Sequence, residues 1–163
     1  MNIKNSTFRV ELVVWFKWQG DSELDMANYI RVYRGTINKY TVVEERHEGN
    51  DHYQRAQMDV TINEGFDTTR FPLGSYALKV YIEPTYSIDR VKFIADEQSD
   101  MNEAYVLPGY VLLRYDTGIH NIIYDTNYGN PAMEGKQVAN TEHLTRLEIT
   151  RGGVLCDRRS IVS

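Results

Sequence analysis

The sequence predicts an all-β domain, and three observations support that prediction. Val, Ile, Thr, Tyr, Phe and Trp make up 57 of the 163 residues, whereas Ala contributes only 7. β-Branched and aromatic side chains suit the pleated, half-buried surface of a sheet. Short runs with an apolar residue at every second position recur along the chain and are separated by turn residues. The single cysteine, Cys156, excludes an intramolecular disulfide framework and any zinc module built from several cysteines.

The clearest strand runs from Phe8 to Trp18, where apolar side chains occupy every even-numbered position. A period of two over eleven residues is incompatible with a helix. Short strands are expected next at residues 29–33 and 40–43. Another is expected at residues 58–62, and this apolar alternation ends at Gly65. The alternation at residues 76–82 stops at Pro84, which has no N–H to donate to a ladder. The remaining strands are predicted at residues 91–95, 110–115, 119–124 and 144–150.

These nine short strands are typical of a sandwich or a barrel. Residues 22–25 resemble a helix N-cap followed by an acid and could begin two helical turns at most. We find no internal repeat, linker or low-complexity stretch, so residues 1–163 are interpreted as a single domain. The family resemblance given below implies that it is a ligand-binding domain.

The charge and hydropathy of the chain argue against two classes of partner. Eighteen Lys and Arg against 23 Asp and Glu give a net charge of −5, the wrong sign for a broad basic surface that binds nucleic acid. The longest uninterrupted apolar run, Leu12 to Phe16, is far below the roughly 20 residues that span a bilayer. Any membrane contact is therefore expected through segments outside this chain.

The usual enzyme signatures are absent from the sequence. There is no Gly-x-Ser-x-Gly elbow, no His-Glu-x-x-His helix and no phosphate-binding glycine loop. Cys156 has no histidine near it in the sequence and is interpreted as a small apolar side chain. We therefore expect no enzymatic activity. A small β-barrel enzyme stays open as an alternative that would need His52, Asp96 and Glu103 to gather in one cavity.

Two parts of the sequence could hold a metal ion. Asp96, Glu97 and Asp100 offer hard oxygen ligands on one expected loop and predict a possible calcium site, with a solvated acidic loop as the alternative. His47 and His52 lie five residues apart, and a third ligand would have to come from a neighbouring carboxylate at position 45, 48 or 51. The stretch at residues 125–130 begins like an EF-hand loop, but a lysine stands at its twelfth position.

Four segments, taken in order, carry a family resemblance: residues 5–24 (NSTFRVELVVWFKWQGDSEL), 66–83 (FDTTRFPLGSYALKVYIE), 104–110 (AYVLPGY) and 124–151. Together they resemble the extracellular, or periplasmic, ligand-binding domain of a prokaryotic pentameric ligand-gated ion channel. This is the branch of the Cys-loop receptor superfamily that lacks the disulfide, which agrees with the single cysteine. The resemblance covers residues 5–151, with Gly74 in place of an aspartate of the family pattern.

The resemblance implies an immunoglobulin-like twisted β-sandwich of about nine to ten short strands. It also implies a homo-pentamer that binds a small molecule between subunits and transmits the signal to a membrane pore outside this chain. Such a domain lies on the periplasmic or extracellular face of the cell membrane. No resident cofactor is implied.

The resemblance further assigns site residues. Glu83 and Tyr86 fall in the loop after a central strand, and Phe71-Pro72 falls in the loop that couples to the membrane part. The other implied ligand-binding residues are aromatic or basic: Tyr124, Tyr128, Trp15, Tyr53 and Arg55. Aromatic faces attract a cation by about 0.5–2 kcal/mol each, and Glu83 would fix an ammonium group, so the expected ligand is an amine.

Two other interpretations stay open. Trp15 and Trp18 lie three residues apart on one strand, so they face opposite sides and at most one of them can line an interface. Tyrosines in a sandwich also pack across strands without binding anything. A stand-alone β-sandwich module for carbohydrate or peptide, with no channel attached, is therefore the alternative function.

Overall fold

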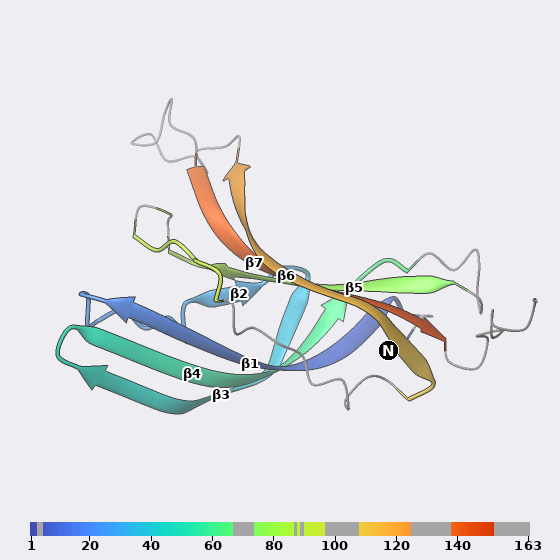
Figure 1. The fold of residues 1–163 in the computed structure, drawn as a ribbon, viewed down its shortest axis with the longest axis horizontal. Coiled ribbons are helices and arrows are strands. Elements are labelled where there is room, and N and C mark those ends of the chain that lie inside the picture. Colours follow the sequence, from blue (N-terminus) through green and yellow to red (C-terminus); the bar gives the residue numbers. More distant parts are fainter. Residues whose placement is uncertain are drawn as a thin grey trace, which may run out of the picture.

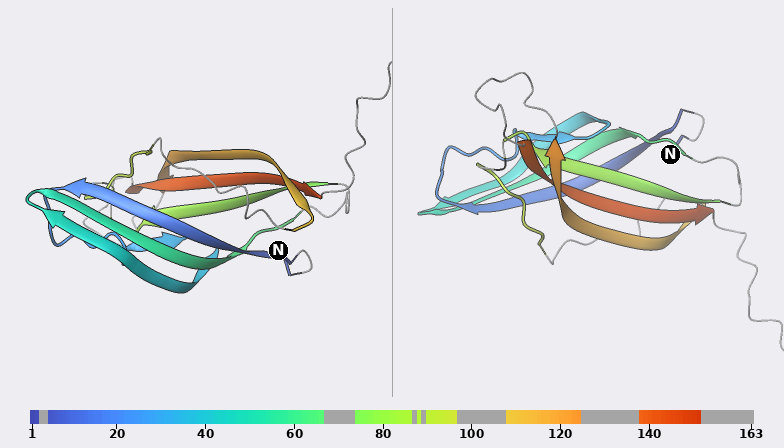
Figure 2. Two further views of the ribbon diagram at one scale, coloured as in Figure 1. Left: turned by 60° about the horizontal axis from the view of Figure 1, so that its bottom comes forward. Right: turned by 90° about the horizontal axis from the view of Figure 1, so that it is seen from above.

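The structure, a computed structural model, describes residues 1–2, 5–66, 74–86, 88, 90–96, 108–124 and 138–151. These residues form seven β-strands in two antiparallel sheets that pack as a sandwich (Figure 1). The two layers are seen edge-on in Figure 2. The described part of the chain contains no helix, and so none long and apolar enough to cross a membrane. The predicted all-β sandwich is confirmed.

The three-stranded sheet has the order β1-β4-β3. Its strands are β1 (Thr7–Gln19), β3 (Gly35–Glu48) and β4 (Asp51–Asn63). The turn between β3 and β4 contains Gly49, whose φ of 62° suits a residue without a Cβ atom. Because β4 is the central strand, the even-numbered residues on its inner face are covered from both sides.

The four-stranded sheet has the order β2-β5-β7-β6. Its strands are β2 (Ile30–Val32), β5 (Ser75–Pro84), β6 (Tyr110–Tyr124) and β7 (Val138–Arg151). The end of β6 and the start of β7 bend away from the rest of the sandwich (Figure 1).

The hydrophobic core lies between the inner faces of the two sheets. On β4, Met58 and Val60 have no exposed surface and Ile62 is 1 % exposed. Alternate residues of β5, from Tyr76 to Ile82, face them and are also buried. Strict alternation on both strands is the pattern of sheets that bury one face only.

Residues 90–96 close one side of the sandwich without forming the strand predicted at 91–95. Val91 is buried, and the ring of Phe93 lies 6.1 Å from that of Phe16 on β1. The backbone N–H of Phe93 donates to Thr141 Oγ1 on β7 over 2.9 Å. The apolar alternation of this segment is therefore satisfied by packing between two sheets rather than by pairing in one.

Three other predictions of local structure are corrected. The two strands expected at 110–115 and 119–124 are one strand, β6, which continues through Gly118 with a register shift between Leu112 and Arg114. The segment at 22–25 forms a turn, in which the N–H of Leu24 donates to the carbonyl of Asp21, and not a helix. Seven strands therefore replace the expected nine within the described residues.

Candidate functional site

A hollow of about 410 Å³ lies on the outer face of the four-stranded sheet. Alternate residues of β5 form its floor, because Lys79, Tyr81 and Glu83 share the face opposite to the core. Its remaining walls come from the β2–β3 turn, the end of β4, and strands β6 and β7: Tyr33, Arg34, Glu64, Ile122, Tyr124 and Glu142.

Glu83 is the most deeply buried charge in this hollow, with a side chain only 2 % exposed. Arg31 stands directly opposite on β2, and its Nη2 and Nε lie 2.6 and 3.0 Å from Glu83 Oε2. The same oxygen accepts a hydrogen bond from the Tyr124 hydroxyl over 3.3 Å. The hydrogen bond to Glu83, and then the negative charge of that carboxylate, raise the pKa of Arg31. Arg31 thus neutralises Glu83, and Tyr124 donates a hydrogen bond to the same carboxylate. Glu83 belongs to strand β5 rather than to the loop expected from the sequence.

Glu142 on β7 is the second carboxylate of the hollow and has no ion pair within the described ranges. Burial raises the pKa of Glu142, the charge of Glu83 raises it further, and His120 opposes both. The pKa of Tyr81 is also raised, first by burial and then by the charges of Glu142 and Glu64. Arg34 and Arg146 oppose the rise in the pKa of Tyr81, so the negative charges of this part of the hollow are partly offset.

Aromatic rings and two cations complete the lining. The Tyr33 ring meets the Tyr81 ring edge-on at 6.2 Å, and the guanidinium of Arg34 lies 5.5 Å from the centre of the Tyr33 ring. Lys79 provides the other positive charge. The hollow thus offers a carboxylate and ring faces to an ammonium group, and Arg34 or Lys79 to an anionic group on the same ligand.

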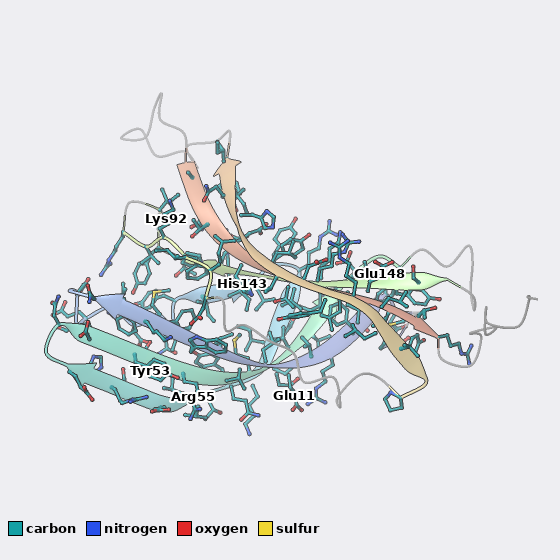
Figure 3. The ribbon with its side chains drawn as sticks, viewed as in Figure 1. Glu11, Tyr53, Arg55, Lys92, His143 and Glu148 are labelled. Carbon is teal, nitrogen blue, oxygen red and sulfur yellow. The ribbon has the colours of Figure 1, made fainter. Side chains whose placement is uncertain are left out.

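A second cluster lies on the outer face of the three-stranded sheet. Trp15 on β1 pairs in register with Arg55 on β4, and Tyr53 precedes Arg55 on the same face. Arg55 is ion-paired with Glu44 at 3.0 Å, and the guanidinium of Arg46 lies 4.9 Å from the Tyr53 ring. Tyr53 and Arg55 lie along the β3–β4 side of the molecule in Figure 3. This group is called the Trp15 cluster below: Trp15, Glu44, Arg46, Tyr53 and Arg55.

The structure therefore divides the residues that the resemblance assigns to one ligand site. Glu83 and Tyr124 meet in the hollow, whereas Trp15, Tyr53 and Arg55 lie on the opposite outer face. Tyr86 lies outside both groups. Its ring stacks on that of Tyr29 at 4.7 Å and carries the Arg90 guanidinium 4.5 Å from its centre. The predictions for Tyr128, Phe71 and Pro72 fall outside the described residues.

The predicted calcium ligands are only partly within the described residues. Asp96 accepts hydrogen bonds from Trp15 Nε1 over 2.9 Å and from Lys17 Nζ over 3.1 Å, so it holds the indole in place. Glu97 and Asp100 fall outside the described ranges, as do Glu103, Cys156 and the 125–136 stretch. In the described part of the chain, no group of three or more His, Cys, Asp and Glu side chains could hold a metal ion.

Several residues of the hollow were not expected from the sequence. Tyr81 could have been found, because it lies two positions before Glu83 and so shares its face on the strand. Tyr33 and Glu142 reach the hollow, and Arg31 reaches Glu83, only because β2 and β7 pair with β5. No local pattern in the sequence reports that pairing.

Glu142→Gln is expected to stabilise the protein at neutral pH by less than about 1 kcal/mol, because solvent screens a half-buried charge. The folded state raises the pKa of Glu142, so folding binds its proton more tightly and stability falls as pH rises past the ordinary glutamate range. The gain should shrink at pH 4, where Glu142 is mostly protonated in both states. Urea denaturation at pH 4 and 7.5 measures this. Glu148→Gln, elsewhere on β7, should show no such gain, and an equal gain there would contradict the assignment.

Comparison with known proteins gives no independent assignment. No protein-family model matches the sequence, and no curated protein sequence matches it.

Proposed function

We propose that this chain is a ligand-sensing β-sandwich whose hollow binds a small organic ammonium ion. The observation that carries the proposal is the unpaired, half-buried Glu142 among the rings of Tyr33, Tyr81 and Tyr124. A carboxylate with raised pKa gains free energy when a cation neutralises it, and tyrosine faces add cation–π attraction. A primary ammonium group suits the hollow better than a quaternary one, because it can donate hydrogen bonds to a carboxylate.

We further propose that the Trp15 cluster completes this site from a neighbouring copy of the chain. The outer faces of two packed sheets point away from each other, so the hollow of one copy can approach the Trp15 cluster only on another copy. This division supports the resemblance to the ligand-binding domain of pentameric channels, in which two faces of adjacent subunits enclose the ligand. On this proposal the fold is immunoglobulin-like, and the chain lies on the periplasmic or extracellular face of the membrane and acts on a pore outside it.

Isothermal titration calorimetry with propylammonium tests the proposal. We expect dissociation constants near 1 mM, the range of a ligand with few atoms, and at least tenfold weaker binding to Glu142→Gln because the ligand loses its ion pair. Glu148→Gln serves as the matched control and should bind like the wild type. Tetramethylammonium should bind more weakly, and propionate should not depend on Glu142.

The same titration separates the alternatives. Propylammonium binding that is unchanged in Glu142→Gln would refute the assignment of this hollow. Binding of an oligosaccharide or a peptide, with no binding of either ammonium ion, would favour the stand-alone binding module.

A further inference from the structure

His47 and His52 meet at the tip of the β3–β4 hairpin, independently of the site proposed above. They stand directly opposite each other on the inner face of the three-stranded sheet. Their Nδ1 atoms are 2.8 Å apart and their ring centres 5.0 Å apart, so the two nitrogens point at each other between the rings. A contact this short between two nitrogens is a hydrogen bond and requires one proton between them.

The outer nitrogen of each ring is held by an acceptor. His52 Nε2 lies 3.2 Å from the carbonyl oxygen of Gly20, which can only accept, so His52 Nε2 carries a hydrogen. His47 Nε2 lies 3.2 Å from Glu45 Oε1. That oxygen also accepts a hydrogen bond from Gln54 Nε2 over 2.8 Å.

The orientation of Gln54 establishes that Glu45 acts as the acceptor. The backbone N–H of Ala27 donates to Gln54 Oε1 over 3.0 Å, so the amide nitrogen of Gln54 must be the end that faces Glu45 and Asp25. His47 Nε2 therefore also carries a hydrogen. With one more proton between the Nδ1 atoms, the four ring nitrogens hold three protons, and the pair carries one positive charge.

Burial of His52, which is only 4 % exposed, opposes that charge. The Trp18 ring, at a centroid distance of 5.4 Å, and the neighbouring carboxylates favour it. The hydrogen bonds that Arg90 and the Glu23 N–H donate to Asp21 lower the pKa of that carboxyl, so Asp21 keeps its negative charge. The charged groups on the side of the pair are Asp21 and Asp25 before β2, Glu45 on β3, and Arg90 after β5, which pairs with Asp21. Arg46, Glu48 and Asp51 stand on the two neighbouring rungs and face the other side of the sheet.

We propose that His47 and His52 form a binding site for a single proton, shared between their Nδ1 atoms. Loss of that proton leaves two lone pairs facing each other at 2.8 Å, and a second proton brings two N–H groups face to face. Either change breaks the bridge, so the hairpin tip is tightest in an intermediate pH range. The adjacent rung of the hairpin carries Arg46 and Tyr53 of the Trp15 cluster, on the opposite face of the sheet.

Nitrogen NMR of the histidine rings in the wild-type chain, from pH 4.5 to 9.5, tests the proposal. We expect His52 to keep its hydrogen on Nε2, His47 to be doubly protonated near neutral pH, and a strongly deshielded proton to couple the two Nδ1 atoms. Two rings that titrate independently, with no shared proton at any pH, would overturn it.

Stability measurements provide the second test. His47→Gln should lower the folded-to-unfolded ratio at least tenfold at the intermediate pH, and less at pH 4.5 and 9.5, where the wild type has already lost the bridge. A cost of His47→Gln that is the same at all three pH values would overturn the proposal, because a histidine that only packs would be missed equally throughout. His47 is 41 % exposed, so its replacement does not open the core.

Discussion

Met58→Ala is expected to lower the free energy of unfolding by about 2–5 kcal/mol, the range for truncating a fully buried methionine. Met58 has no exposed surface, lies on the central strand β4, and stands between Leu12 on β1 and Tyr40 on β3 in the register of the sheet. Its removal leaves a cavity facing β5, where close packing prevents the two sheets from collapsing onto the space. Equilibrium urea denaturation followed by tryptophan fluorescence measures the change.

Val13→Ala is the matched control for that experiment. Val13 lies on the outer face of the same sheet and is 55 % exposed, so its truncation should change stability by no more than about 0.5 kcal/mol. Equal effects of the two substitutions would mean that the inner face of β4 is not enclosed by the second sheet.

Arg31→Met is expected to cost about 2–4 kcal/mol, because it leaves the carboxylate of Glu83 buried without its counter-charge. Arg31 is the sole ion-pair partner of Glu83 among the described residues, and Tyr124 alone would remain as its hydrogen-bond donor. Equilibrium urea denaturation at pH 7.5 measures the change.

The rescue variant makes the cause of that loss testable. Adding Glu83→Leu to Arg31→Met removes the stranded charge and should recover most of the lost stability, since apolar replacement of a buried ion pair is often neutral. Arg55→Met serves as a control, because its partner Glu44 keeps a second guanidinium, that of Arg46, at 2.8 Å. A double variant as unstable as Arg31→Met alone would show that Arg31 stabilises by packing and not by charge.

The local part of the fold could be predicted from the sequence. The inner faces of β1 and β5 follow from apolar residues at every second position, as at Val10, Leu12, Leu78 and Val80. The same reasoning failed at residues 91–95, because an alternating pattern reports which side chains are buried and not which strand they pair with. It also split β6 at Gly118, although that glycine is accommodated inside a long strand.

The site was less accessible to sequence reasoning than the fold. Glu83 and Tyr124 could be named as site residues from the sequence. The strand order brings Arg31 to Glu83 and brings Glu142 into the hollow. The pairing of β5 between β2 and β7 connects residues that lie more than 50 positions apart in the chain. Such pairings depend on the whole fold, so the negative charge around Glu142 becomes visible only in three dimensions.

The most direct test of the proposed site is a chemical-shift titration of the ¹⁵N-labelled protein with propylammonium. We expect the amide shifts to concentrate on the residues around the hollow, on β5, β6 and β7. They should be lost in Glu142→Gln but kept in Glu148→Gln. Shifts confined to the Tyr29–Tyr86 stack, or identical shifts in Glu142→Gln and the wild type, would contradict it.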